Sequence, residues 1–189
     1  MAQSLDTADF LGMRDMPDFA RTPGGYVAIR QTDIAPLAYE VVVNAPPRPD
    51  TLEALVAFAD GANPDLVRTL YEACNGIFIG ATKFGVYGVR DAGVDRSDLE
   101  SATNTPWSIN LPNIYERPAS WPHAALIVGV GDAYATAEES TRLYHSIEAG
   151  PRICVSPETD FEAEVRAYTS VEDWLSAEVA LALADRDRW

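Results

Sequence analysis

Short apolar runs follow one another closely between residues 76 and 156, and this spacing restricts the fold more than any other feature of the sequence. The runs are GIFI (76–79), KFGVYGV (83–89), part of INLPNIYER (109–117), ALIVGVG (125–131), RLYHSIE (142–148) and RICVS (152–156). Parallel neighbours would need crossover connections of a dozen or more residues, whereas antiparallel strands can be joined by tight turns. The pattern therefore predicts an antiparallel meander of about five to six strands.

Two amphipathic helices are predicted ahead of these strands. The first follows Thr51, which can cap it, and has apolar side chains at i, i+3, i+4 and i+7 from Leu52 to Ala59. The second begins at Asn63-Pro64, because asparagine is a good N-cap and proline is favoured in the first turn. Gly76 stands where a left-handed residue commonly ends a helix. The three prolines of residues 44–50 are expected to exclude helix and central strand there.

A last helix is predicted within residues 165–185, where Ser170 and Asp173 have the spacing of a capping box. Near the other end, residues 26–30 and 38–43 can pair as a β-hairpin, preceded by a loosely structured lead-in over residues 1–25. The sequence thus predicts an α+β fold, with an antiparallel sheet packed against helices. Residues 1–49 are expected to form an N-terminal extension containing the hairpin, and residues 50–189 the main domain.

The charge balance is strongly acidic and points to a class of partner. The chain has 29 acidic and 14 basic residues, a net charge of −15. This field repels nucleic acid and anionic membranes, and it would steer a basic protein instead, although net charge also serves solubility alone. Acidic residues gather between residues 131 and 164, and we take them as candidate partner-binding residues: Asp132, Glu138, Glu139, Glu148, Glu158, Asp160, Glu162 and Glu164.

The sequence offers little for catalysis. Its two histidines, His123 and His145, do not accompany a G-x-S-x-G nucleophile motif, and no cluster of ligand-type side chains has metal-site spacing. We therefore predict no catalytic residue, no metal and no cofactor. Cys74 and Cys154 are expected to be reduced core residues. Without an apolar run of about 20 residues or a basic-then-apolar N-terminus, a cytoplasmic protein is expected.

Trp107 and Trp121 flank a proline-rich segment that is expected to be exposed. Core packing is the usual role of such residues. The alternative is an aromatic anchor in an interface, where tryptophan is enriched. Both tryptophans are therefore added to the candidate partner-binding residues.

The ordered series of motifs resembles the SMI1/KNR4 family of the SUKH superfamily. A helix ending in Asn-Gly, glycine-rich strands with Tyr-Gly, an LPNI…W segment and a final S-x-E-x-W-L helix carry the resemblance, over roughly residues 50–180. The residues concerned are Tyr71, Asn75, Gly76, Gly80, Tyr87, Gly88, Asn113, Ile114, Trp121, Gly150, Ser170, Trp174 and Leu175. The resemblance implies an α+β fold without catalysis. In bacterial members it implies immunity proteins, which bind and block a cognate polymorphic toxin, often a nuclease.

The leading hypothesis is therefore an immunity protein that occludes the active site of a basic toxin domain. A regulatory or scaffold protein-protein interaction module of the same fold is the alternative, and an enzyme or small-ligand binder is a third. The sequence leaves the oligomeric state open.

Overall fold

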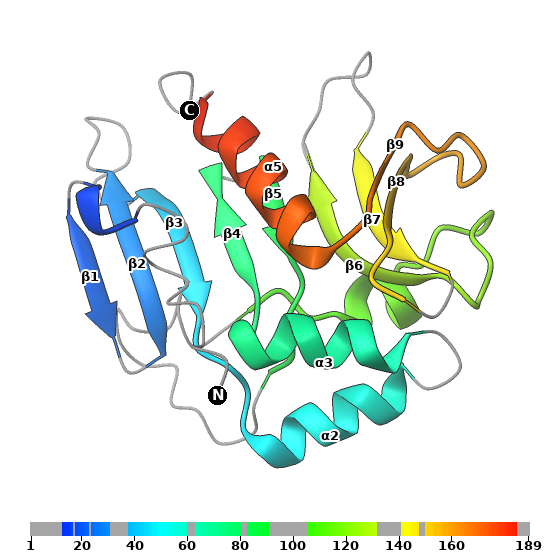
Figure 1. Ribbon diagram of the computed structural model, residues 1–189, viewed down its shortest axis with the longest axis horizontal. Coiled ribbons are helices and arrows are strands. Elements are labelled where there is room, and N and C mark those ends of the chain that lie inside the picture. Colours follow the sequence, from blue (N-terminus) through cyan, green and yellow to red (C-terminus); the bar gives the residue numbers. More distant parts are fainter. Residues whose placement is uncertain are drawn as a thin grey trace.

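A computed structural model describes residues 13–16, 18–22, 24–30, 38–59, 63–80, 83–90, 106–131, 141–147 and 150–184. Within these ranges a nine-stranded sheet dominates, and each strand pairs antiparallel with the next one along the chain (Figure 1). The strands are β1 (Phe19–Thr22), β2 (Gly25–Arg30), β3 (Ala38–Asn44), β4 (Ile77–Ile79), β5 (Phe84–Val86), β6 (Leu126–Gly131), β7 (Arg142–Ser146), β8 (Ile153–Pro157) and β9 (Arg166–Tyr168). The α+β class and the antiparallel meander are confirmed.

The sheet is larger than the five to six strands expected from the sequence. The predicted hairpin is present as β2 and β3, but β3 also pairs with β4, so the hairpin continues the main sheet. Residues 19–22 form β1 inside the segment expected to be a loose lead-in, and β9 was also missed. These are short strands, whose pairing depends on partners distant in sequence, so local pattern indicates them poorly.

Residues 109–117 were expected to form a strand in part, and this is wrong. They contain the π-helical turn η3 (Leu111–Tyr115). Pro112 has no N–H to donate to a strand ladder, whereas it is tolerated in the first turn of a helix. Only an isolated bridge from Gly88 to Ser108 precedes the turn.

The helices begin where local sequence favours them. In α3 (Pro64–Ala73) the Asn63 side chain accepts a hydrogen bond from the Leu66 N–H at 3.2 Å, as predicted. In α5 (Val171–Ala184) the Ser170 hydroxyl caps the Asp173 N–H at 3.0 Å. Helix α2 (Pro49–Phe58) starts earlier than expected, at a proline, because the first helical position needs no N–H donor. None of the helices in the described ranges is long and apolar enough to cross a membrane.

One face of the sheet packs against α5, which crosses in front of β4 and β5, while α2 and α3 lie together beside one end of these strands (Figure 1). Trp174 is fully buried, with its ring centroid 5.7 Å from that of Phe84 and 5.3 Å from that of Tyr144. A Cβ atom at Gly129 would come within 3.0 Å of the Trp174 ring. The glycine therefore lets α5 approach the sheet closely.

The opposite face is covered by irregular chain. Trp107 packs edge-on against Phe78, with ring centroids 4.6 Å apart. Further along the sheet, Trp121 packs against His145 at 4.8 Å and Phe161 at 5.1 Å. The segments around η3 and between β8 and β9 thus close the second side of the core.

Gly76 has a positive φ of 111°, but Cys74 ends α3, so Gly76 leads into β4 and is not the helix cap expected from the sequence. A Cβ atom there would also meet the Val86 carbonyl oxygen at 3.0 Å. We expect Gly76→Val to lower the free energy of unfolding by roughly 1–2 kcal/mol or more, measured by denaturant titration. Gly150→Val is the control, since Gly150 has φ 128° and, apart from its chain neighbours, no atom of the described residues lies within 4 Å of its Cβ position. A loss at Gly76 smaller than at Gly150 would contradict the steric argument.

Candidate binding site beside the π-helical turn

Tyr87 directly follows β5, and hydrogen bonds hold its backbone on both sides. Its N–H donates to the Val128 carbonyl oxygen at 3.0 Å, and the buried Tyr71 hydroxyl donates to its carbonyl oxygen at 2.6 Å. Residues alternate between the two faces of a strand. Phe84 faces α5, so Tyr87, three residues later, points to the opposite face of the sheet.

Asn113 holds η3 against β6. Its side-chain N–H groups donate to the carbonyl oxygens of Ile109 at 2.8 Å and Ile127 at 2.7 Å, and its side-chain oxygen accepts the Ile127 N–H at 2.9 Å. The Asn113 side-chain amide thus bonds the Ile127 backbone as a neighbouring strand would. The register of the β6–β7 pairing shifts between Ile127 and Gly129, next to this contact. This attachment leaves three large apolar side chains of the turn facing solvent, and Tyr115 is 75% exposed. The three are Leu111, Ile114 and Tyr115.

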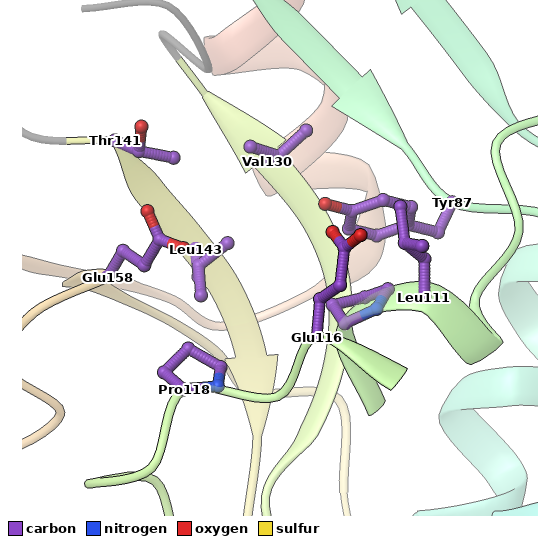
Figure 2. Close-up of a pocket in the computed structure, with 9 residues that line it drawn as sticks. Tyr87, Leu111, Glu116, Pro118, Val130, Thr141, Leu143 and Glu158 are labelled. Carbon is purple, nitrogen blue, oxygen red and sulfur yellow. The ribbon is translucent and has the colours of Figure 1, made fainter. Parts of the chain in front are cut away.

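A cavity of about 150 Å³ lies beside η3, on the sheet face opposite α5. Figure 2 shows the carboxylate of Glu116 pointing toward the hydroxyl end of Tyr87, and Glu158 entering from the other side of the cavity. The lining residues are Tyr87, Leu111, Pro112, Glu116, Pro118, Val130, Thr141, Leu143 and Glu158. Two carboxylates and a phenol therefore share a small space whose other walls are mostly apolar.

Tyr87 is buried, whereas Glu116 and Glu158, the two carboxylates that line this cavity, belong to exposed residues. The tyrosine is 6% exposed, and its hydroxyl has no hydrogen-bond partner among the residues that the structure describes. Burial, followed by the negative charges of Glu158 and Glu116, raises the pKa of Tyr87. At neutral pH the hydroxyl is therefore uncharged, and it can both donate and accept a hydrogen bond.

Most motif residues of the family resemblance serve the backbone or the core. Asn75 exchanges hydrogen bonds of 2.7 and 2.8 Å with the backbone of Val89, and a Cβ atom at Gly88 would lie 2.0 Å from the Asn75 carbonyl oxygen. Gly80 and Gly150 have positive φ, and Trp174 and Leu175 are buried on α5. Ile114, by contrast, is exposed and belongs to the candidate site. The glycine-rich stretch after α3 thus has a structural role, because it allows close backbone contacts at Asn75 and Gly88.

Part of the acidic set lies in the described structure. Asp132, Glu138, Glu139 and Glu148 lie outside the described residues. Glu158, Asp160, Glu162 and Glu164 are exposed in the connection from β8 to β9. Of these, Glu158 lines the cavity, whereas Glu164 forms an exposed ion pair with Arg152, with N–O distances of 2.8 and 3.0 Å.

The two candidate tryptophans pack against the core, the usual role of such residues, and neither is an exposed anchor. Trp107 is half-buried against Phe78. Trp121 is 4% exposed, and its indole N–H donates to the Glu158 carbonyl oxygen at 2.8 Å. A buried indole with its one donor satisfied offers no surface to a partner. Instead, Trp121 positions the backbone of Glu158 at the cavity.

Sequence reasoning missed Glu116 and the exposed side chains of η3. The local signal was the segment LPNIYERP, in which apolar and aromatic residues stand between two prolines that disfavour a central strand. That signal indicates an exposed turn, but it does not reveal that Glu116, Glu158 and Tyr87 meet.

The buried His145–Ser156 pair does not have the arrangement of a nucleophile and its base. His145 Nε2 lies 3.1 Å from Ser156 Oγ, but the Ser156 hydroxyl donates to the Phe161 carbonyl oxygen at 3.0 Å. The serine proton therefore does not point to the imidazole, which must act as the donor through Nε2–H. Burial lowers the pKa of His145 to about 4. The pair is a packed hydrogen-bonded unit beneath Trp121.

Other reactive side chains are also buried or dispersed. Cys74 and Cys154 are buried free thiols, as expected, and burial raises the pKa of Cys74 to about 11. Across the described ranges, no three His, Cys, Asp or Glu side chains are grouped so that they could hold a metal ion. The cavity beside η3 therefore remains the candidate site.

Comparison of the chain with protein-family models, with curated proteins and with solved structures found no match. The assignment of function below therefore rests on the geometry of this site and on the motif resemblance.

Proposed function

We propose that the protein is a non-enzymatic, cytoplasmic immunity protein of the SMI1/KNR4 (SUKH) type, which binds and neutralises a basic toxin domain. The observation that carries this proposal is the exposed apolar turn η3, with Ile114 and Tyr115 at its surface and Glu116 and Glu158 beside it. Protein interfaces commonly combine an apolar centre rich in tyrosine with a polar rim. The turn and its carboxylates have this arrangement.

The charge of the molecule suggests how such binding would block a toxin. A nuclease holds phosphate with Lys and Arg side chains, and carboxylates can occupy the same side chains. The net charge of −15 would also accelerate encounter with a basic surface. Neutralisation would then be steric occlusion of the active site together with charge complementarity, and it requires neither a cofactor nor binding of nucleic acid.

The proposal is tested by co-expressing the chain with the toxin-like product of an adjacent gene. We expect the wild-type chain to restore growth and to form a complex with that product. The same surface could instead serve a regulatory or scaffold module with an endogenous partner. Growth that is not restored, together with capture of an unrelated cellular protein through η3, would favour that alternative and overturn the immunity role.

A pair of substitutions tests whether η3 is the interface. We expect Tyr115→Ala to weaken the complex by tenfold or more, because exposed tyrosines at interface centres commonly contribute about 2 kcal/mol. Leu181→Ala is the matched control, since Leu181 is 51% exposed on α5, over the other face of the sheet. Affinities can be measured by surface plasmon resonance. Equal affinities of the two variants would place the interface elsewhere.

A further inference from the structure

We infer that the cavity between Tyr87, Glu116 and Glu158 is a receptor for one arginine side chain of the partner protein. The inference deepens the proposed function and rests on it for the source of the arginine. The chemical preference of the cavity for a guanidinium group, however, follows from the cavity alone and can be tested without the partner.

The cavity is lined by two carboxylates, those of Glu116 and Glu158. Within the described residues, neither the Glu116 nor the Glu158 carboxylate has an ion-pair or side-chain hydrogen-bond partner. The neighbouring Arg117 does not compensate them, because its guanidinium donates to the carbonyl oxygens of Pro122 and, at 2.7 Å, Ala125. A cation placed between the two carboxylates would gain from both, and a phosphate or carboxylate ligand would be repelled.

The Tyr87 side chain is almost fully buried, and it lines the cavity. Its hydroxyl makes no hydrogen bond to a described residue, so a ligand or water that enters the cavity can complete it. A guanidinium N–H pointing down the cavity would supply the missing donor, while its other N–H groups face the carboxylates.

The size of the cavity and its apolar walls also suit an arginine side chain. A cavity of about 150 Å³ can accept a molecule as large as benzene. A planar guanidinium with part of its methylene stem is of similar size, whereas a nucleotide is much larger. Apolar walls suit the stem of an amphipathic side chain. The apolar wall residues are Leu111, Pro112, Pro118, Val130 and Leu143.

Arginine fits this arrangement better than lysine. Figure 2 shows the Tyr87 hydroxyl beside the Glu116 carboxylate, with Glu158 across the cavity from them, so the acceptors are spread over two sides. A guanidinium presents five N–H donors in a fixed plane, so it can reach separated acceptors at once. An ammonium is a compact point charge that is more strongly hydrated.

The experiment titrates the purified full chain with short capped peptides and follows the backbone amide signals of the residues that line the cavity by NMR. The probes are acetyl-Gly-Arg-Gly-amide, its lysine counterpart, its neutral citrulline counterpart and free spermidine. We expect a dissociation constant on the order of millimolar for the arginine peptide, as for a single-residue contact. Binding should weaken severalfold with lysine and by tenfold or more with citrulline. Tighter binding of spermidine than of the arginine peptide would overturn the inference that the cavity receives an arginine side chain of a protein.

Matched variants identify the residues responsible. Glu116→Gln combined with Glu158→Gln should weaken the arginine peptide tenfold or more, and Tyr87→Phe severalfold, without change in folding because these groups are unpaired. Glu172→Gln is the control, as Glu172 is exposed on α5. Equal binding of the arginine and citrulline peptides, or an unchanged affinity in the double variant, would overturn the inference. Specific arginine binding without restoration of growth in co-expression would leave the cavity assignment standing and remove only the immunity role.

Discussion

Glu178→Ala should lower the free energy of unfolding by roughly 2–3 kcal/mol, because the buried acceptor of two tyrosine hydroxyls is lost and each buried polar group left unsatisfied costs about 1–3 kcal/mol. Glu178 lies on α5, is 3% exposed and faces the sheet. It accepts hydrogen bonds from the hydroxyls of Tyr144, at 2.6 Å, and Tyr168, and it pairs with Arg166 at 3.3 Å. Truncation would leave the fully buried Tyr144 hydroxyl without an acceptor.

Denaturant titration of three variants separates this network from a general helix effect. Glu172→Ala removes an exposed carboxylate of the same helix and should cost no more than about 1 kcal/mol. Glu178→Gln keeps a hydrogen-bond acceptor and should cost less than Glu178→Ala. If Glu178→Ala is no more destabilising than Glu172→Ala, the buried network does not hold α5 on the sheet.

The protein should also lose stability as the pH falls from about 6.5 to 4, because His145 is buried in its neutral form. Burial is the main cause that lowers the pKa of His145 from 6.5 to about 4; Arg152 lowers it further and Glu164 opposes this. Between these two values the unfolded chain binds a proton that the folded chain does not. Stability from His145 is thus fully present above pH 6.5 and declines toward pH 4. The loss approaches about 3 kcal/mol, at roughly 1.4 kcal/mol per pKa unit.

His145→Phe isolates this contribution from the carboxylates that also titrate in acid. The phenyl ring can pack against Trp121 and Phe161, while Ser156 keeps its hydrogen bond to the Phe161 carbonyl oxygen. Unfolding free energies at pH 6.5, 5 and 4 should fall less steeply in the variant than in the wild type. His145→Gln provides a second comparison if the larger ring disturbs packing. Parallel curves for wild type and both variants would show that His145 does not carry the acid sensitivity.

The starts of α3 and α5 could be predicted because their signals act within a single turn, whereas α2 begins before Thr51, the cap expected from the sequence. Asn63 and Ser170 each bond an N–H group three residues ahead, so the residues that decide the cap are adjacent in sequence. The inner face of α5 was also predictable, since helical spacing alone places its apolar side chains together. The residues that share this spacing are all buried, namely Val171, Trp174, Leu175, Val179 and Ala182.

Burial of aromatic residues in irregular chain was less predictable. The proline-rich segment around Trp121 was expected to be exposed, and the sequence left open whether the ring packs in the core or anchors an interface. The ring is buried because His145 and Phe161, which are distant from it in sequence, pack against it. The same applies to η3, which a short apolar run could not distinguish from a strand. In both cases the structure depends on contacts with residues that are distant in sequence, so the local sequence does not reveal it.

The sequence by itself determined the α+β class, the N-terminal caps of α3 and α5, the hairpin of β2 and β3 and the acidic character of the chain. These depend on local spacing, on turn chemistry and on composition. Only the tertiary structure decided that the sheet has nine strands and that Tyr87, Glu116 and Glu158 surround one cavity. Strand pairing and burial join residues far apart in the chain, and their free energy is gained only when both partners are in place. For that reason, the candidate site could not be read from any single segment.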